Sequence, residues 1–170
     1  MQIGSRRASS KAGRDQPVAA RCLEFLRQSQ RSEGAWPIDT NLSTWLTTAG
    51  VAALASAGEL SRIHRGQTAR WIAAQQYKAI HPYTHAEPGG WAWTHLAGGV
   101  PDVDDTSGAI LALTELGHQD GIAAGTAWLL KLQNPDGGWP TFCRGWGKLP
   151  FDKSAPDLTA HALRALHAAG

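Results

Sequence analysis

Apolar residues recur at helical spacing in six segments of the chain, which predict helices over residues 16–30, 44–57, 62–77, 105–116, 120–133 and 157–169. The first, third and fifth segments combine a bulky apolar face with a Gln at or near their ends, whereas the other three are apolar and small on nearly every side. Helices of that second kind are typically buried on both sides, so we expect them to form an inner wall. No segment shows sustained period-two alternation, and we therefore predict an all-α fold.

The six predicted helices belong to a unit that the sequence repeats three times. In each unit a helix ends in Gln (Gln30, Gln76, Gln133), and a loop with Gly and Trp follows (Trp36, Trp91, Trp139). The next helix carries the pattern Thr-x-small-x-aliphatic-x-Ala-Leu, or a near variant, and ends at a Gly that suits left-handed backbone. The copies are offset by 59 and 53 residues, as helix-pair repeats are. The sequence thus predicts three helix hairpins.

The Gln and Trp of each unit have a structural use. A Gln side chain can hydrogen-bond backbone groups of the adjoining loop, while the indole packs over the end of the helix. Because a buried Trp serves packing more often than function, we interpret Trp36, Trp91 and Trp139 as packing clamps rather than ligand contacts.

Three carboxylates, those of Asp102, Asp104 and Asp105, lie within four residues directly before or at the start of the fourth predicted helix. We call them the acid cluster. Asp caps helices, and the helix dipole favours negative charge at this end, so capping is a sufficient explanation for any single one of them. It explains three of them less well.

The repeat offsets supply neighbours for Asp104. They place Asp157 at the equivalent position of the next inner helix and Trp45 at that of the preceding one. His161 follows Asp157 by four residues and therefore shares its helix face. An imidazole and a carboxylate beside the acid cluster are suited to proton transfer. The alternative for His161 is a satisfied histidine in an Ala-rich core.

Other chemistries fit these residues less well. A prenyl-diphosphate metal site would need Asp-Asp-x-x-Asp, but Asp104-Asp105 is followed by Thr, Ser and Gly, and an EF-hand would need ligands that are missing. A glycoside-cleaving pair would need two separated carboxylates and sugar-binding polar groups, which we do not identify. We therefore expect no metal and no cofactor.

Composition narrows the class of protein further. Of the 170 residues, 42% are hydrophobic and 18% charged, and a formal net charge of +2 is too small to indicate nucleic-acid binding. Residues 1–15 are polar, and we expect a solvated tail rather than a signal peptide. No segment approaches the ~20 apolar residues that span a bilayer. Cys22 and Cys143 match no disulfide framework or zinc spacing, so we expect a cytoplasmic protein.

From about Pro17 to Gly170 the sequence resembles the squalene–hopene cyclases and their relatives, the class II terpene cyclases. Asp102 to Thr106 is similar to the family's DxDD-T motif, and the three Gln and Gly-x-Trp units resemble its QW repeats. Asp157 to His161 is similar to the family's Asp-x-Thr-Ala-His stretch. The resemblance implies an α/α toroid, of which residues 16–170 would form about half a barrel in three hairpins.

The resemblance also implies roles for the acid cluster and its neighbours. Asp104 would protonate a terminal alkene to start cationic cyclisation, with Asp102 and Asp105 tuning it. His161 would hydrogen-bond Asp104, and Asp157 belongs to the stretch that supports the acid. Like-charged neighbours would hold the proton on Asp104, and an imidazolium would stabilise the carboxylate left behind.

Three aromatic residues match positions that line the family's cavity and stabilise cations: Trp45, Trp93 and Phe142. Two of them differ in ring type from the family, which leaves the choice of a squalene-like polyprenyl substrate open. Three hairpins would leave inner helix faces exposed, so we expect a complementing cyclase chain or self-association. A lipid-soluble substrate would also favour peripheral membrane contact. The alternative is a non-catalytic, truncated repeat module or helical binding scaffold.

Overall fold

The computed structural model describes residues 17–30, 32, 34, 41–142 and 149–170. The chain divides into two compact units, Met1–Thr40 and Asn41–Gly170. The single cyclase domain expected over 16–170 stays a prediction. In the first unit, helix α1 (Pro17–Ser29) buries no side chain. The predicted tail 1–15, the clamp expected at Trp36 and residue Cys143 lie outside the described residues.

The second unit contains helices α2 (Ser43–Ser56), α3 (Arg65–Ala74), α4 (Val103–Leu116), α5 (Ile122–Leu132) and α6 (Pro156–Ala169). Two short 3-10 turns, Leu60–Arg62 and Pro150–Asp152, precede α3 and α6. The described residues contain isolated β-bridges but no strand, which confirms the all-α prediction. No helix in the described ranges has the length and apolar character that crossing a membrane requires.

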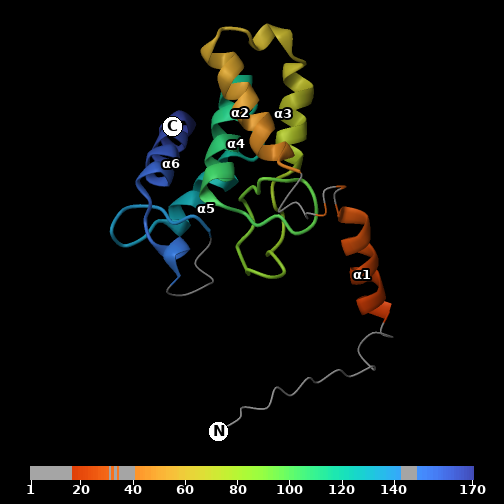
Figure 1. Ribbon diagram of the computed structural model, residues 1–170. Coiled ribbons are helices and arrows are strands. Elements are labelled where there is room, and N and C mark those ends of the chain that lie inside the picture. The colour runs from red at the N-terminus through yellow and green to blue at the C-terminus, as the bar shows by residue number, and fades with distance from the viewer. Residues whose placement is uncertain (1–16, 31, 33, 35–40, 143–148) are drawn as a thin grey trace. The chain divides into compact units, whose positions relative to one another are not determined.

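Helix α4 is the centre of the second unit, and it lies between α2 and α6 while also contacting α3 and α5 (Figure 1). Nine of its side chains are buried, against three in α2 and two in α6. The predicted burial on both sides therefore holds for α4 and is wrong for α2 and α6. Within the described residues of the second unit, each of these two contacts an inner helix on one side only, and Leu46 and Leu163 remain more than half exposed.

The Trp residues of the second and third repeats are packing clamps, as predicted. Trp91 is fully buried, and its Nε1 donates to the carbonyl oxygen of Ile72 at 2.7 Å, near the end of α3. Trp139 is likewise buried, and its Nε1 donates to the carbonyl oxygen of Leu129 at 2.9 Å, in α5. Each indole therefore fastens a loop to the helix that precedes it.

The Gln residues tie the same loops down, which confirms the predicted use of their side chains. Gln133 Nε2 donates to the carbonyl oxygen of Gly137 at 2.8 Å. Gln76 is buried, and its Nε2 lies within 2.9 Å of two carbonyl oxygens, those of Gly89 and Gly121. In the first unit, Gln30 Nε2 donates in the same way to the carbonyl oxygen of Gly34 at 2.8 Å.

Two of the clamped loops hold the first turn of α4 between them. The N–H of Asp102 donates to the carbonyl oxygen of Trp91 at 3.1 Å, and the N–H of Val103 donates to that of Thr141 at 3.2 Å. Inside the helix, the Thr106 hydroxyl accepts the N–H of Trp91 at 3.0 Å. The repeat loops thus determine where the acid cluster lies.

A close contact between α5 and Trp91 gives a test of this packing. A methyl group on Gly125 would lie 2.7 Å from Cζ3 of Trp91 and 3.2 Å from the Ile110 side chain, and both neighbours are fully buried. We expect Gly125→Ala to lower the free energy of unfolding by about 1–3 kcal/mol through overpacking. Urea unfolding followed by circular dichroism measures the change.

The matched control is Gly50→Ala in α2, because a methyl group there would have no neighbour within 4 Å. Ala favours a helix interior over Gly by about 1 kcal/mol, so this variant should be as stable as the parent or more stable. Equal losses in the two variants would contradict the packing explanation.

Candidate active site

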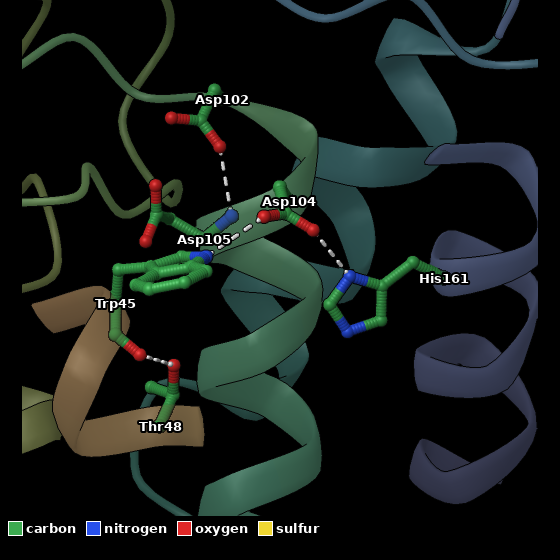
Figure 2. Close-up of polar contacts among 6 residues, drawn as sticks. All are labelled: Trp45, Thr48, Asp102, Asp104, Asp105 and His161. Carbon is green, nitrogen blue, oxygen red and sulfur yellow. Dashed lines mark hydrogen bonds and ion pairs between the residues drawn. The ribbon is translucent and has the colours of Figure 1, made fainter. Parts of the chain in front are cut away.

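Asp104 lies in the first turn of α4 and accepts hydrogen bonds from the two helices beside it (Figure 2). Its Oδ1 is 2.7 Å from Nδ1 of His161 in α6, and its Oδ2 accepts from Nε1 of Trp45 in α2 at 3.1 Å. The Asp104 side chain is 42% exposed and that of His161 is 26% exposed. Each of the three inner helices thus supplies one member of this group.

The start of α2 is held in place by the loop that precedes α4. The N–H groups of Thr44 and Trp45 donate to the carbonyl oxygen of Trp93 at 3.0 and 3.2 Å. Ser43 Oγ lies 2.7 Å from Nδ1 of His95 in the same loop. These bonds fix the first turn of α2 next to the first turn of α4, at the level that the repeat offsets indicate.

Asp102 and Asp105 are nearly inaccessible to solvent, with 5% and 3% exposure. Asp102 is the N-cap of α4, and its Oδ1 accepts the N–H of Asp105 at 2.7 Å. Among the described residues, Oδ1 of Asp105 has no hydrogen-bond partner. Capping therefore accounts for Asp102, but not for the buried carboxyl of Asp105.

Burial changes the titration of these two carboxyls. Desolvation raises the pKa of Asp102 well above its ordinary value, and the charge of Asp105 adds to the effect. Desolvation also raises the pKa of Asp105 to about 6, with a contribution from the charge of Asp104. The two buried carboxyls of the acid cluster therefore bind a proton more readily than an ordinary aspartate does.

Asp104 titrates in the opposite direction. The hydrogen bond from His161 lowers the pKa of Asp104 below its ordinary value, and the bond from Trp45 lowers it further, against a smaller effect of burial. From the sequence, like-charged neighbours are predicted to hold the proton on Asp104, and that prediction is wrong for this geometry. The physical reason is that both oxygens of Asp104 face donors, while its acidic neighbours point elsewhere (Figure 2).

A cavity of about 630 Å³ opens beside the acid cluster. It collects most of the predicted site residues, since its lining includes Trp93, Asp102, Asp104, Asp105, Phe142, Asp157 and His161. A smaller cavity of about 240 Å³ adjoins Asp104 and His161 and is lined by Trp45. The structure thus places Trp93 and Phe142 in one cavity and Trp45 in another, with the Asp104–His161 pair bordering both.

Arg164 was not singled out from the sequence, yet it lines both cavities together with Asp104 and His161. It is the only Lys or Arg among the residues that line either one within the described ranges. Its position three residues after His161 on an otherwise Ala-rich helix was the available signal, because that spacing places both side chains on one face.

The buried carboxyl of Asp105 generates a prediction about stability and pH. A carboxyl with a pKa of about 6 when folded binds its proton more readily in the folded state than in the unfolded state. Its contribution to stability therefore falls as the pH rises from about 4 to about 6. We expect Asp105→Asn to raise the free energy of unfolding by about 1–3 kcal/mol at pH 7.5, and by much less at pH 4.

Urea unfolding of both proteins at the two pH values measures this difference. Asp120→Asn is a suitable control, because its side chain is 85% exposed and lies outside the site. An equal gain for Asp105→Asn at both pH values would show that desolvation of the charge is not the cause.

Comparison with known proteins identifies the family to which this arrangement belongs. The sequence model of the squalene–hopene cyclase C-terminal domain matches residues 42–170. Drimenyl diphosphate synthase of Streptantibioticus cattleyicolor is 34% identical, over 86% of this chain and 27% of that protein. Enfumafungin synthase of Hormonema carpetanum is 28% identical, over 79% of this chain and 12% of that protein. A squalene–hopene cyclase of Alicyclobacillus acidocaldarius is 26% identical, over 81% of this chain and 26% of that protein.

The chain spans between 12% and 27% of the length of these three relatives. The matched region contains all five helices of the second unit, the acid cluster and both cavities. An inner layer of α2, α4 and α6 against the outer helices α3 and α5 is part of an α/α toroid. The chain belongs to the squalene–hopene cyclase family.

Proposed function

We propose that this chain supplies the proton-donating side of a class II terpene cyclase active site. Asp104 would protonate the terminal alkene of a polyprenyl substrate and thereby start cationic cyclisation. One observation supports the proposal above all. Both oxygens of Asp104 lie within hydrogen-bond distance of a donor, and this carboxyl borders a cavity lined by aromatic rings. Membership of the squalene–hopene cyclase family supports the same chemistry.

The proposed step moves one proton. The O–H bond of Asp104 breaks, and the π electrons of the alkene form a C–H bond, which leaves a carbocation on the more substituted carbon. An alkene is a very weak base, so the step requires a strong acid whose conjugate base is stabilised. The donors on Asp104 supply that stabilisation, and its lowered pKa is the equilibrium measure of it.

A strong acid must also carry a proton when the substrate arrives. Asp102, whose pKa burial raises well above its ordinary value, keeps a proton close to Asp104, and the cluster titrates as a coupled unit. A hydrocarbon that enters the cavity displaces water from Asp104, which is 42% exposed without it. Desolvation disfavours the carboxylate, so substrate binding itself would shift the proton toward Asp104.

The carbocation then needs protection from water and a partner of negative potential. Trp93 and Phe142 line the larger cavity, and each ring face can stabilise a cation by roughly 1–2 kcal/mol where water is excluded.

The relatives include a squalene–hopene cyclase and a drimenyl diphosphate synthase, so their names indicate two kinds of substrate. We therefore propose a polyprenyl substrate and test both a hydrocarbon and a diphosphate. A complementing cyclase chain, self-association and peripheral membrane contact stay predictions.

The decisive variant is Asp104→Asn, which keeps the shape of the side chain and removes the acid. Purified protein, alone and co-expressed with the neighbouring reading frame, is incubated with squalene or farnesyl diphosphate. Cyclisation is an isomerisation, so gas chromatography with mass spectrometry should detect new compounds of unchanged mass, after dephosphorylation for the diphosphate. We expect Asp104→Asn to reduce their yield at least 100-fold, as loss of a general acid does.

Asp120→Asn, a change of the same type on an exposed side chain, should leave the yield unaltered. Cyclic product from Asp104→Asn at the parental rate would refute the assignment of the acid. Absence of product from the parent in every preparation would favour the alternative function, a non-catalytic helical repeat module.

A further inference from the structure

We propose that Trp45 is a positioning residue of the acid, whose indole N–H holds Oδ2 of Asp104 and stabilises the carboxylate that proton donation leaves behind. This role differs from the one that the family resemblance implies for Trp45, which is cation stabilisation by its ring face. The catalytic meaning of the new role rests on the proposed function, whereas the hydrogen bond itself can be tested without turnover.

The geometry of the bond carries the argument. Among the described residues each oxygen of Asp104 has one donor, and the two donors come from opposite sides of α4, His161 from α6 and Trp45 from α2 (Figure 2). An indole N–H can only donate, so Oδ2 of Asp104 must be the acceptor of this bond. Hydrogen bonds to a charged acceptor are stronger than those to a neutral one. Trp45 therefore favours the carboxylate over the neutral acid.

The position of the ring supports this role over cation binding. Trp45 lines the cavity of about 240 Å³ with Asp104 and His161, whereas Trp93 and Phe142 line the cavity of about 630 Å³. A cation held between the rings of Trp93 and Phe142 would therefore lie in the larger cavity, whereas Trp45 lines the smaller one, and the two adjoin at Asp104 and His161. The part of Trp45 that reaches the acid is its N–H.

Trp45 is anchored well enough to act in this way. Its backbone N–H donates to the carbonyl oxygen of Trp93 at 3.2 Å, and its own carbonyl oxygen accepts from the Thr48 hydroxyl at 3.0 Å (Figure 2). The Trp45 side chain is 43% exposed, so solvent weakens the influence of its hydrogen bond on the pKa of Asp104.

The charges around Asp104 make Trp45 an informative position. Asp102 caps α4 and Asp105 lies in its first turn, and α6 contributes Asp157, His161 and Arg164 to the surrounding cavities. Helix α2 carries no ionisable side chain at all. A change at Trp45 thus alters the hydrogen bond to Asp104 without adding or removing a titratable group. A change at His161 would alter the hydrogen bond and remove a titratable group together.

The test replaces Trp45 by Phe, which keeps an aromatic ring and removes the N–H. Carboxyl ¹³C NMR of Asp-labelled protein, with Asp104→Asn for assignment, gives the pKa of Asp104 directly. We expect Trp45→Phe to raise it by about half a unit to one unit, because a stabiliser of the carboxylate is lost. Trp71→Phe is the matched control, since this partly buried Trp of α3 packs against the core and contacts His95 rather than the acid.

A second replacement guards against loss of shape. Site-specific incorporation of 3-benzothienylalanine at position 45 keeps the two fused rings and lacks the N–H, and it should raise the pKa of Asp104 as Phe does. If neither replacement moves that pKa while both proteins stay folded, the proposal is overturned.

Activity separates this proposal from the proposed function. Turnover needs protonated Asp104, so Trp45→Phe should move the alkaline limb of the pH profile upward by the same amount as the NMR shift. Its maximal rate should fall several-fold, because the acid is weaker. A shifted pKa in a protein that never forms product would support the hydrogen bond and refute the cyclase assignment. An unshifted pKa with intact turnover would do the reverse.

Discussion

The hydrogen bonds that tie the first turn of α4 to two repeat loops determine the rest of the site. The N–H groups of Asp102 and Val103 reach carbonyl oxygens on either side, and Thr106 closes the link from within the helix. The loop at Trp91 is itself fixed to α3 by the indole and by Gln76. The repeat loops therefore link the first turn of α4, and with it Asp104, to the outer helix α3.

This arrangement has an energetic cost that the same bonds offset. Asp102 and Asp105 are almost completely buried, and burial of a carboxylate is unfavourable unless it is paired or protonated. Asp102 recovers part of the cost by capping α4, whereas Asp105 has a raised pKa and an oxygen without a partner among the described residues. A group that lowers stability at neutral pH, next to a proton donor, is what a functional site retains and a purely structural helix start does not need.

The sequence predicts the helices, the clamps and the identity of the acid cluster, because these depend on periodicity and on short spacings. It also predicts that Trp45 and Asp157 lie at the positions equivalent to Asp104 on the neighbouring inner helices, with His161 one turn after Asp157, because the three repeats align. The direction in which the pKa of Asp104 shifts could not be predicted from the sequence, since it depends on which atoms of His161 and Trp45 face the carboxyl. The same limit applies to the two cavities, because side-chain orientation across helices leaves no pattern along the chain.

The acidity of Asp104 is therefore a property of helix packing more than of the motif in which it occurs. Its two donors come from α2 and α6, the helices that flank α4 and that, among the described residues of the second unit, contact an inner helix on one side only. Anything that moves either helix away from α4 would remove a donor and weaken the acid while leaving every residue of the cluster in place. A repeat module could thus keep the three carboxylates and lose the chemistry. A contact on the outer side of α2 or α6 would therefore act on the acid through those two hydrogen bonds.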